Sequence, residues 1–561
     1  MIKLIRVLGL IQGGVSLALA QTVPDAGALR QQFESTQPRR SQAPAPLQSP
    51  APSEERPSLT GVRVAVQRFV FAGNTLISSA ALEQAVQPYV SRTLDFAQLQ
   101  SAATAVAKRY RRDGWVVRVF LPPQDVTQGV VTVQVVESVL GQVKFEGEAP
   151  RRVRRAQVQN IIQAQLAPGA PLNADLLDRA DLIANALSGA RVSMALVEGD
   201  APQTTDAVVR VTDTAMGAGD VSADNTGAAA TGRYRFSANA EWRSPSGSGD
   251  ALGANWAQSL GSDYLRLGYG IPVGDAGWRV GANASYLQYR LVAPELLALH
   301  AQGRSDSLGL EAMYPWVRTR QGNLSLMVSA DSKNFDNQAN ARVSSHYSTH
   351  NFSLGLTGNS EDSWGGGGAN LFNASWVNGQ VNLNGSPNQV GDMNAARTQG
   401  GFAKLRFLAA RQQVLGQDVA LYTAYAGQLA SKNLDSSERF YLGGANGVRA
   451  YPANEAGGSE GQMVNLELRT FWPQGFALTG FYDWGQVRVN RHNDFSGAAL
   501  TNVLRLKGAG LALSWQSSGG LNLKATWARR LGVNPAPNAA GNDQDGTLER
   551  NRFWLSATAF F

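Results

Sequence analysis

The sequence of 561 residues contains no cysteine and only four histidines, and each scarcity excludes a class of site. Without thiols, no disulfide can cross-link the chain and no cysteine-ligated metal centre can form. The histidines are scattered, with no spacing that suits a metal ion; they are His300, His346, His350 and His492. We therefore expect neither a metal site nor a cofactor.

Long apolar runs and a strong charge imbalance are also absent. Beyond the N-terminus, no run reaches the roughly 18 apolar residues that a transmembrane helix needs. The net charge of +7 is modest and spread over the chain, so it does not predict nucleic-acid binding. The densest basic clusters, residues 108–112 and 151–155, are explained more simply as solvated helix faces.

Residues 1–20 have the features of a secretory signal peptide. Lys3 and Arg6 precede a mostly apolar stretch over residues 7–19, and Ala18-Leu19-Ala20 forms an A-x-A cleavage site. We therefore expect this segment to direct the chain out of the cytoplasm.

Residues 21–61 divide into a short helix and a linker. Leu29 and Phe33 are four residues apart, which predicts an amphipathic helix over residues 21–37. Residues 38–61 are rich in proline, alanine, serine and glutamine, a composition that forms no packed core. A tail with only transient helicity is the alternative interpretation of the first segment.

Residues 62–138 and 139–213 predict two small α+β domains with the same order of elements, β-α-α-β-β. Asp95 in the first and Asn173 in the second are suitable N-caps for the second helix of each domain. In the first domain we expect strands over residues 62–71, 116–121 and 130–136, and helices over 79–89 and 95–113. In the second we expect strands over residues 142–147, 192–197 and 207–212, and helices over 151–165 and 173–187.

From residue 214 to residue 561 the apolar residues recur with a period of two. In the segment 233–243, one face carries apolar side chains with aromatic residues at both ends, and the other face is polar or charged. A bilayer explains this arrangement, because aromatic side chains favour its two interfaces and only alternate residues face lipid. We count roughly sixteen such segments, an even number as in closed bacterial barrels. The expected fold is mainly β: a transmembrane β-barrel of about 16 strands, preceded by two α+β domains.

The last segment, residues 553–561, also alternates and ends in Phe561. An apolar edge strand exposed to water invites aggregation, so we expect it to pair with the first strand and close the barrel.

A long glycine-rich loop over residues 436–452 carries Arg449 between apolar neighbours. Long ordered loops are usually functional. An arginine that leaves bulk water needs an anionic partner, and Asp483 on a later strand is the candidate.

These segments resemble the two-partner secretion transporters (TpsB proteins, ShlB/FhaC/HecB-like) of the POTRA-barrel outer-membrane translocase superfamily. The loop contains S-S-E-x-F-x-L-G-G, with Gly443 and Gly444, and then V-R-x-Y, with Val448, Arg449 and Tyr451. The later strand contains F-x-D-x-G, formed by Phe481, Asp483 and Gly485. The F-x-G-N-T, Y-x-x-x-G-W and L-P-P-Q-D segments of residues 71–125 resemble the family's first POTRA domain. Ala450 departs from the family's usual glycine, and it would be strained if the backbone there requires a positive φ.

The resemblance implies that the chain is an outer-membrane pore with its POTRA domains in the periplasm. It would recognise the N-terminal secretion domain of a large exoprotein, of haemolysin or adhesin type, and translocate it to the cell surface by type Vb secretion. The long loop, residues 431–461, would turn into the barrel and be held there by the Arg449–Asp483 pair. The N-terminal helix would plug the pore. Phe561 would be the signal read by the barrel-assembly machinery during insertion among outer-membrane lipid and lipopolysaccharide.

Three other functions are weighed against this one. A barrel-assembly or insertion factor of the same superfamily would usually have more periplasmic domains and no plug helix. A nutrient porin would not need the paired α+β domains. A hydrolase is suggested by the G-x-S-x-G match at Ser459, followed by Asp483 and His492, but the required strand–turn–helix context is missing. We therefore expect no catalytic residues.

Overall fold

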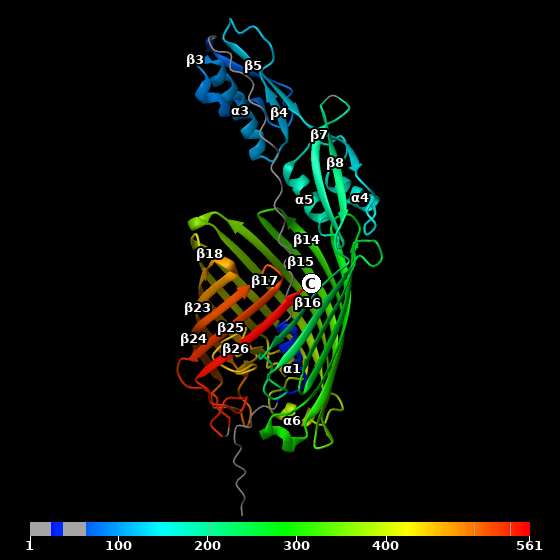
Figure 1. The fold of residues 1–561 in the computed structure, drawn as a ribbon, viewed down its shortest axis with the longest axis vertical. Coiled ribbons are helices and arrows are strands. Elements are labelled where there is room, and N and C mark those ends of the chain that lie inside the picture. Colours follow the sequence, from blue (N-terminus) through cyan, green and yellow to red (C-terminus); the bar gives the residue numbers. More distant parts are fainter. Residues whose placement is uncertain (1–23, 37–62, 202, 499, 539) are drawn as a thin grey trace, which may run out of the picture.

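The computed structural model describes residues 24–36, 63–201, 203–498, 500–538 and 540–561. The expected signal peptide, residues 1–20, and linker, residues 38–61, lie outside these residues. The described chain forms a large barrel with two small α+β units at one end and a helix inside it (Figure 1). The mainly β architecture expected from the sequence is confirmed.

The first α+β unit differs from expectation at its first strand. Instead of one strand there are two, β1 (Arg63–Val66) and β2 (Arg68–Ala72), and β1 pairs with an unpredicted strand, β3 (Arg92–Asp95). A three-stranded sheet has the order β2-β5-β4, with β4 at Val117–Phe120 and β5 at Val130–Glu137. The helices are α2 (Ser79–Val86), η1 (Gln87–Tyr89) and α3 (Phe96–Arg112). Asp95 caps α3 in a capping box with Gln98.

The second unit repeats this architecture without the extra pair. Its sheet has the order β6-β8-β7, with strands at Val139–Glu146, Thr204–Asp213 and Ala190–Glu198. Helices α4 (Arg155–Gln165) and α5 (Ala174–Ala184) contribute apolar side chains to a common core with the sheet. The Asn173 side chain accepts hydrogen bonds from the first turn of α5, as expected of an N-cap.

Sixteen strands of the described chain form one closed antiparallel barrel, and the expected closure is confirmed, because the last strand pairs with the first. The barrel strands are β9 (Gly217–Asp224), β10 (Arg235–Arg243), β11 (Ala251–Ser259), β12 (Ser262–Val273), β13 (Trp278–Arg290), β14 (Gln302–Arg318), β15 (Gly322–Ala339), β16 (Arg342–Asp362), β17 (Gly368–Asn382), β18 (Gly400–Gly416), β19 (Val419–Ala430), β22 (Glu460–Phe471), β23 (Phe476–Arg488), β24 (Val503–Gln516), β25 (Leu521–Arg530) and β26 (Asn551–Phe560). Short helices lie between strands: η2 (Pro294–Leu299), η3 (Trp364–Gly366), α6 (Gln389–Asn394) and η5 (Pro473–Gly475).

Alternation along the strands separates the outer wall from the lumen. On β10, Phe236 is 59% exposed on the outside, whereas its neighbour Arg235 is 9% exposed and points inward. This pattern gives an apolar outer wall and a polar lumen, as a bilayer requires. Among the described residues, no helix has both the length and the apolar character needed to cross a membrane.

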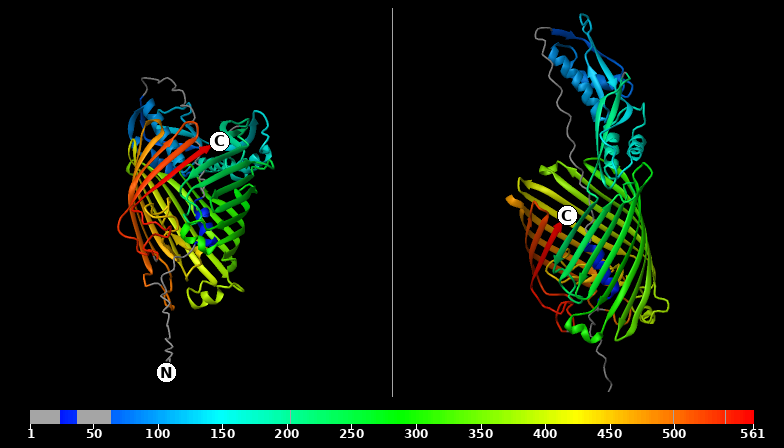
Figure 2. Two further views of the ribbon diagram at one scale, coloured as in Figure 1. Left: turned by 60° about the horizontal axis from the view of Figure 1, so that its bottom comes forward. Right: turned by 45° about the vertical axis from the view of Figure 1, so that its right-hand side comes forward.

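The lumen is occupied by α1 (Ala26–Thr36) and by the loop between β19 and β22, as the two further views also show (Figure 2). This loop enters from the end of the barrel opposite the α+β units (Figure 1). It contains η4 (Ser436–Glu438) and a short ladder between β20 (Phe440–Tyr441) and β21 (Gly457–Gly458).

Polar contacts fix the second α+β unit to the barrel rim. Arg320, in the turn after β14, pairs with Asp178 of α5 at 2.7 Å. A second contact has its donor on the α+β unit: Arg179 of α5 donates a hydrogen bond to the carbonyl of Pro315 on β14 at 2.9 Å. The unit therefore has a defined position over the open end of the barrel.

Candidate functional site: the inturned loop and the helix inside the barrel

We call residues 431–459, between β19 and β22, the inturned loop. Its tip is packed against the barrel wall rather than exposed to water: Leu442, Val448, Ala450 and Tyr451 are all fully buried. They share an apolar cluster with Phe481, Leu506 and Ala528 of β23, β24 and β25. The loop is therefore bound to one side of the lumen.

Arg449 and Asp483 are brought together at the centre of this contact. The guanidinium donates to both carboxylate oxygens of Asp483, with Nη2–Oδ1 at 2.7 Å and Nε–Oδ2 at 2.9 Å. The backbone N–H of Arg449 donates a third hydrogen bond to Oδ2 at 3.0 Å. A bidentate pair of this kind fixes orientation as well as distance.

Arg449 has partners beyond the expected Asp483. Its Nη1 also donates to Oε1 of Glu467 on β22 at 2.8 Å. Its guanidinium lies 3.5 Å above the centre of the Phe481 ring, in a cation–π arrangement. Its carbonyl accepts a hydrogen bond from the indole of Trp554 on β26, at 2.8 Å. The loop tip thus contacts β22, β23 and β26, all on the C-terminal side of the barrel seam.

The spacing of the F-x-D-x-G motif follows from the pleat of β23. Residues two apart on a strand share a face, so Phe481, Asp483 and Gly485 all point into the lumen. Gly485 is needed for space: a Cβ there would lie 2.6 Å from Cδ2 of Leu442 and 3.3 Å from Cγ2 of Val448. Phe481 therefore stacks against Arg449, Asp483 binds Arg449, and Gly485 leaves space for the loop.

Gly443 and Gly444 serve different purposes in the loop. Gly444 has a φ of +116°, which side chains of L-residues rarely allow. Gly443 is required by close packing, because a Cβ there would lie 2.2 Å from the carbonyl oxygen of Pro452. Both glycines shape the turn that presents Val448 and Arg449 to the wall.

Ala450, at the position where the family usually has glycine, is accommodated without backbone strain. It is not among the described residues with positive φ. Its methyl group lies over Gly508 of β24, where an added Cβ would approach it to 2.6 Å. The glycine of the barrel wall thus provides the space that the alanine fills.

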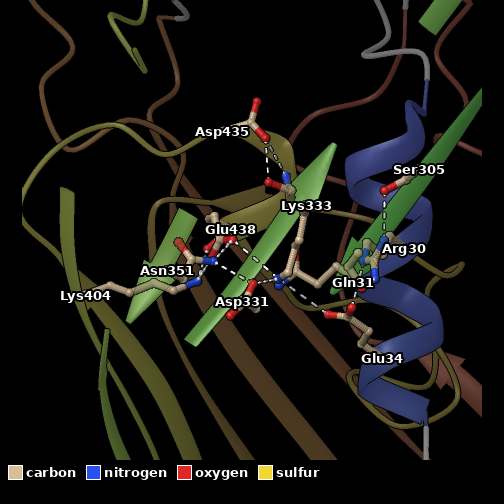
Figure 3. Close-up of polar contacts among 12 residues, drawn as sticks. Arg30, Gln31, Glu34, Ser305, Asp331, Lys333, Asn351, Lys404, Asp435 and Glu438 are labelled. Carbon is tan, nitrogen blue, oxygen red and sulfur yellow. Dashed lines mark hydrogen bonds and ion pairs between the residues drawn. The ribbon is translucent and has the colours of Figure 1, made fainter. Parts of the chain in front are cut away.

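Figure 3 shows a second ionic group, centred on Glu438. This group was not predicted from the sequence. The Glu438 carboxylate pairs with Lys404 of β18, and both side chains are almost fully buried. It also accepts a hydrogen bond from Asn351 of β16 at 2.9 Å and lies 3.7 Å from Lys333 of β15. The sequence signal for this group was the glutamate of S-S-E, Glu438, together with two lysines at inward positions of strands, Lys404 and Lys333.

Helix α1 is bound to the barrel wall through a buried arginine. Arg30 is 1% exposed and donates to the hydroxyl groups of Ser285, Ser305 and Ser307, with Arg30 Nη1–Ser305 Oγ at 2.9 Å. It also pairs with Glu34 one turn later at 2.8 Å, and Glu34 in turn lies 3.8 Å from Lys333 (Figure 3). Phe33 stacks on Tyr264 of β12 with ring centroids 5.1 Å apart.

Helix α1 also contacts the inturned loop directly. The Asp25 carboxylate accepts from the Ser436 hydroxyl at 2.7 and 2.8 Å, and the Gln31 amide donates to the carbonyl of Arg439. Lys333 lies between Glu34 of the helix and Glu438 of the loop. These contacts between the helix and the loop are noncovalent and polar.

Phe561 lies at the barrel seam, at the same end as the α+β units. Its backbone N–H donates to the carbonyl of Gly219 on β9 at 3.0 Å, and the N–H of Gly219 donates back at 3.0 Å. Its ring is 76% exposed on the outer side. The terminal residue thus extends the seam between β26 and β9.

The structure does not assemble a hydrolase triad from Ser459, Asp483 and His492. The buried Ser459 hydroxyl donates to the carbonyl of Val489 at 3.0 Å and accepts from the N–H of Leu434 at 3.0 Å. Asp483 is occupied by Arg449 and Asn465. Within the described residues, neither side chain bonds to the His492 ring.

Two family profiles match the sequence. One, described as haemolysin secretion/activation protein ShlB/FhaC/HecB, matches residues 203–514. The other, described as POTRA domain, ShlB-type, matches residues 64–138.

Curated relatives are similar over most of their length. The heme/hemopexin transporter protein HuxB of Haemophilus influenzae is 24% identical over 99% of this chain and 97% of its own. The outer membrane transporter CdiB of Dickeya dadantii is 23% identical over 78% of this chain and 77% of its own.

Solved structures show the same fold. CdiB from Escherichia coli superposes with a TM-score of 0.68 at 19% identity, covering 96% of both chains. BamA from Haemophilus ducreyi lacking POTRA domains 1–3 superposes with a TM-score of 0.52 at 14% identity, covering 89% of this chain and all of that one.

Proposed function

Because the chain belongs to the ShlB/FhaC/HecB family of haemolysin secretion/activation proteins, we propose that it exports a large partner exoprotein by two-partner secretion. It is an outer-membrane pore with POTRA domains in the periplasm. The observation that carries the proposal is a lumen filled by helix α1 and by the inturned loop, both bound to the barrel wall.

We divide the chain accordingly. The signal peptide is residues 1–20, the plug helix 21–37 and the linker 38–61. The first POTRA domain is residues 62–138, the second is 139–213, and the barrel is 214–561. The inturned loop belongs to the barrel.

The POTRA domains receive the N-terminal secretion domain of the partner as an extended chain. Each sheet has an edge strand, β4 in the first and β7 in the second, that can accept a further strand through backbone hydrogen bonds. Half-exposed apolar side chains lie on these edges, with Phe120 on β4 and Leu196 and Val197 on β7. Backbone pairing accommodates many sequences, which suits a secreted partner.

The exoprotein then crosses the lumen after α1 has left it. The inturned loop remains attached through Arg449 and shapes the wall of the open pore. No step is catalytic and no cofactor takes part. Folding of the partner at the cell surface gives the transport its direction.

The partner is of the haemolysin or adhesin type. The relatives' descriptions name a heme/hemopexin transporter and outer membrane transporters, which fits a surface-delivered exoprotein. Insertion through the barrel-assembly machinery, guided by Phe561, and contact with lipopolysaccharide complete the proposed set of partners.

A barrel-assembly factor remains the second candidate, because BamA shares the barrel fold. The helix bound inside the lumen favours secretion, since an insertion factor has no use for a plug. Co-expression with a candidate exoprotein of haemolysin or adhesin type tests the choice. We expect the exoprotein in the medium or on the cell surface. Unchanged export after deletion of the transporter would exclude the proposal.

A further inference from the structure

The outer wall of the barrel carries a group of unpaired cations at the end away from the POTRA domains. Arg505 and Lys507 on β24 and Arg529 on β25 are exposed. Within the described residues, none of the three forms an ion pair, and the only polar partner of Arg505 is the amide of Gln486 at 2.8 Å. We call these three residues the outer basic patch.

Strand register places the patch where the apolar wall ends. Going along β24, the outward residues are Trp515, Leu513, Leu511 and Ala509, followed by Lys507 and Arg505. On β25, Arg529 follows the outward residue Trp527 and lies opposite Ala509. Lys507 and Arg529 are therefore diagonal neighbours on one face.

Aromatic residues border the patch on the membrane side. Lys507 lies opposite Trp484 of β23, and Tyr482 lies opposite Ala509. Aromatic side chains at this position mark the level of the lipid headgroups. The cations thus lie at or just beyond the boundary of the hydrocarbon layer.

Two other cations at the same end of the barrel are paired with carboxylates. On β14, Arg304 pairs with Asp336 of β15 at 2.9 Å. On β23, Arg488 pairs with Glu460 at 3.0 Å. The outer basic patch differs from these two positions in having no carboxylate partner among the described residues.

We infer that the outer basic patch binds the phosphate groups of an anionic lipid in the extracellular leaflet. Guanidinium and ammonium groups bind phosphate oxygens through charge-assisted hydrogen bonds, and three such donors on adjacent strands suit a headgroup with more than one phosphate. The inference rests on the proposed function for the orientation of the barrel. It adds a lipid site that is separate from the transport path.

The test uses the full chain in detergent and lipid A with two phosphates as the probe, with bound lipid counted by native mass spectrometry. We expect Lys507→Gln combined with Arg529→Gln to weaken binding roughly twenty-five-fold, since each basic residue near an anionic surface contributes about fivefold. Arg304→Gln, the matched control with its own carboxylate partner, should bind as the unmodified protein does.

Two further measurements separate the sources of phosphate. Dephosphorylated lipid A should bind as weakly as the double variant does to the phosphorylated form, and inorganic phosphate at equal concentration should not compete. Equal binding by the double variant, or equal binding of the dephosphorylated lipid, would overturn the inference. Channel conductance of the double variant, measured in parallel, should be unchanged. If the unmodified protein showed no channel conductance, that result would count against the proposed pore and not against the lipid site.

Discussion

The carboxylate of Asp25, the residue before α1, accepts the hydroxyl proton of Ser436 in the inturned loop, with its two oxygens 2.7 and 2.8 Å from Ser436 Oγ. The contact is close, because a Cβ at Gly27 would lie 2.7 Å from the same hydroxyl oxygen. The helix and the loop thus stabilise each other within the lumen. Both are attached to the wall by polar and apolar contacts: buried Arg30, Leu29 and Phe33 hold the helix, and buried ion pairs with a packed apolar cluster hold the loop.

Removal of one side of the Arg449 contact should impair secretion. Arg449→Ala leaves the fully buried Asp483 without its cation, a change that costs about 3 kcal/mol in buried pairs. We expect a barrel that is still inserted but exports several-fold less partner at equal membrane abundance. Arg304→Ala, which breaks an exposed outer pair, should export normally. Export by Arg449→Ala equal to that control would refute the anchoring role.

The packing of Gly485 against Leu442 gives a second prediction. Gly485→Ala should displace the loop and destabilise its contact by roughly 1–3 kcal/mol through overpacking. We expect faster proteolysis of the loop and reduced export, both partly restored by Leu442→Ala. Gly480→Ala on the outer face of the same strand is the control, because the nearest atom would lie 3.8 Å from the new Cβ. Identical behaviour of the two glycine variants would show that the lumenal contact is unimportant.

Arg30 should determine how firmly the plug is held. Arg30→Ala removes the hydrogen bonds to three wall serines and the pair with Glu34, so α1 should leave the lumen more often. We expect a higher open fraction in single-channel recordings and greater sensitivity of cells to large antibiotics. Arg304→Ala should match the unmodified protein in both assays. An unchanged open fraction would show that other contacts suffice to hold α1.

Glu137 predicts an acid-sensitive first POTRA domain. Burial alone would raise the pKa of this carboxyl, but hydrogen bonds from Thr75, Leu76 and Tyr110 outweigh it and hold the pKa below its usual value. A depressed pKa contributes stability above the unfolded pKa, about 4.3, that is lost as pH falls through the lower folded value. The urea midpoint of the helical circular dichroism signal should therefore fall on acidification.

The variant that tests this role is Glu137→Gln. Its urea midpoint should be lower at pH 7 and should fall less on acidification than that of the unmodified protein. Glu146→Gln is the control, because Glu146 makes only an exposed contact with Arg210 at 3.5 Å. A Glu137→Gln protein with the same pH dependence as the unmodified one would contradict the assignment.

Local patterns in the sequence were sufficient for the architecture but not for all of the lumenal contacts. The period of two at residues 233–243 predicts a membrane strand, because lipid on one side and water on the other impose strict alternation. The β1–β3 pair was missed, since two four-residue strands in a sheet of their own carry too little pattern. The partners of Glu438 were missed because Lys404 and Lys333 lie on β18 and β15, and no local rule places the inturned loop between these strands. The fit of Ala450 over Gly508 likewise depends on three-dimensional packing.

The central claim, a membrane pore closed by a removable helix, is tested most directly by planar-bilayer conductance of the chain with and without residues 21–37. The account predicts mostly closed channels with brief openings for the full chain and long-lived open channels for the truncated one. Absence of channels from both proteins, or identical conductance of the two, would contradict it.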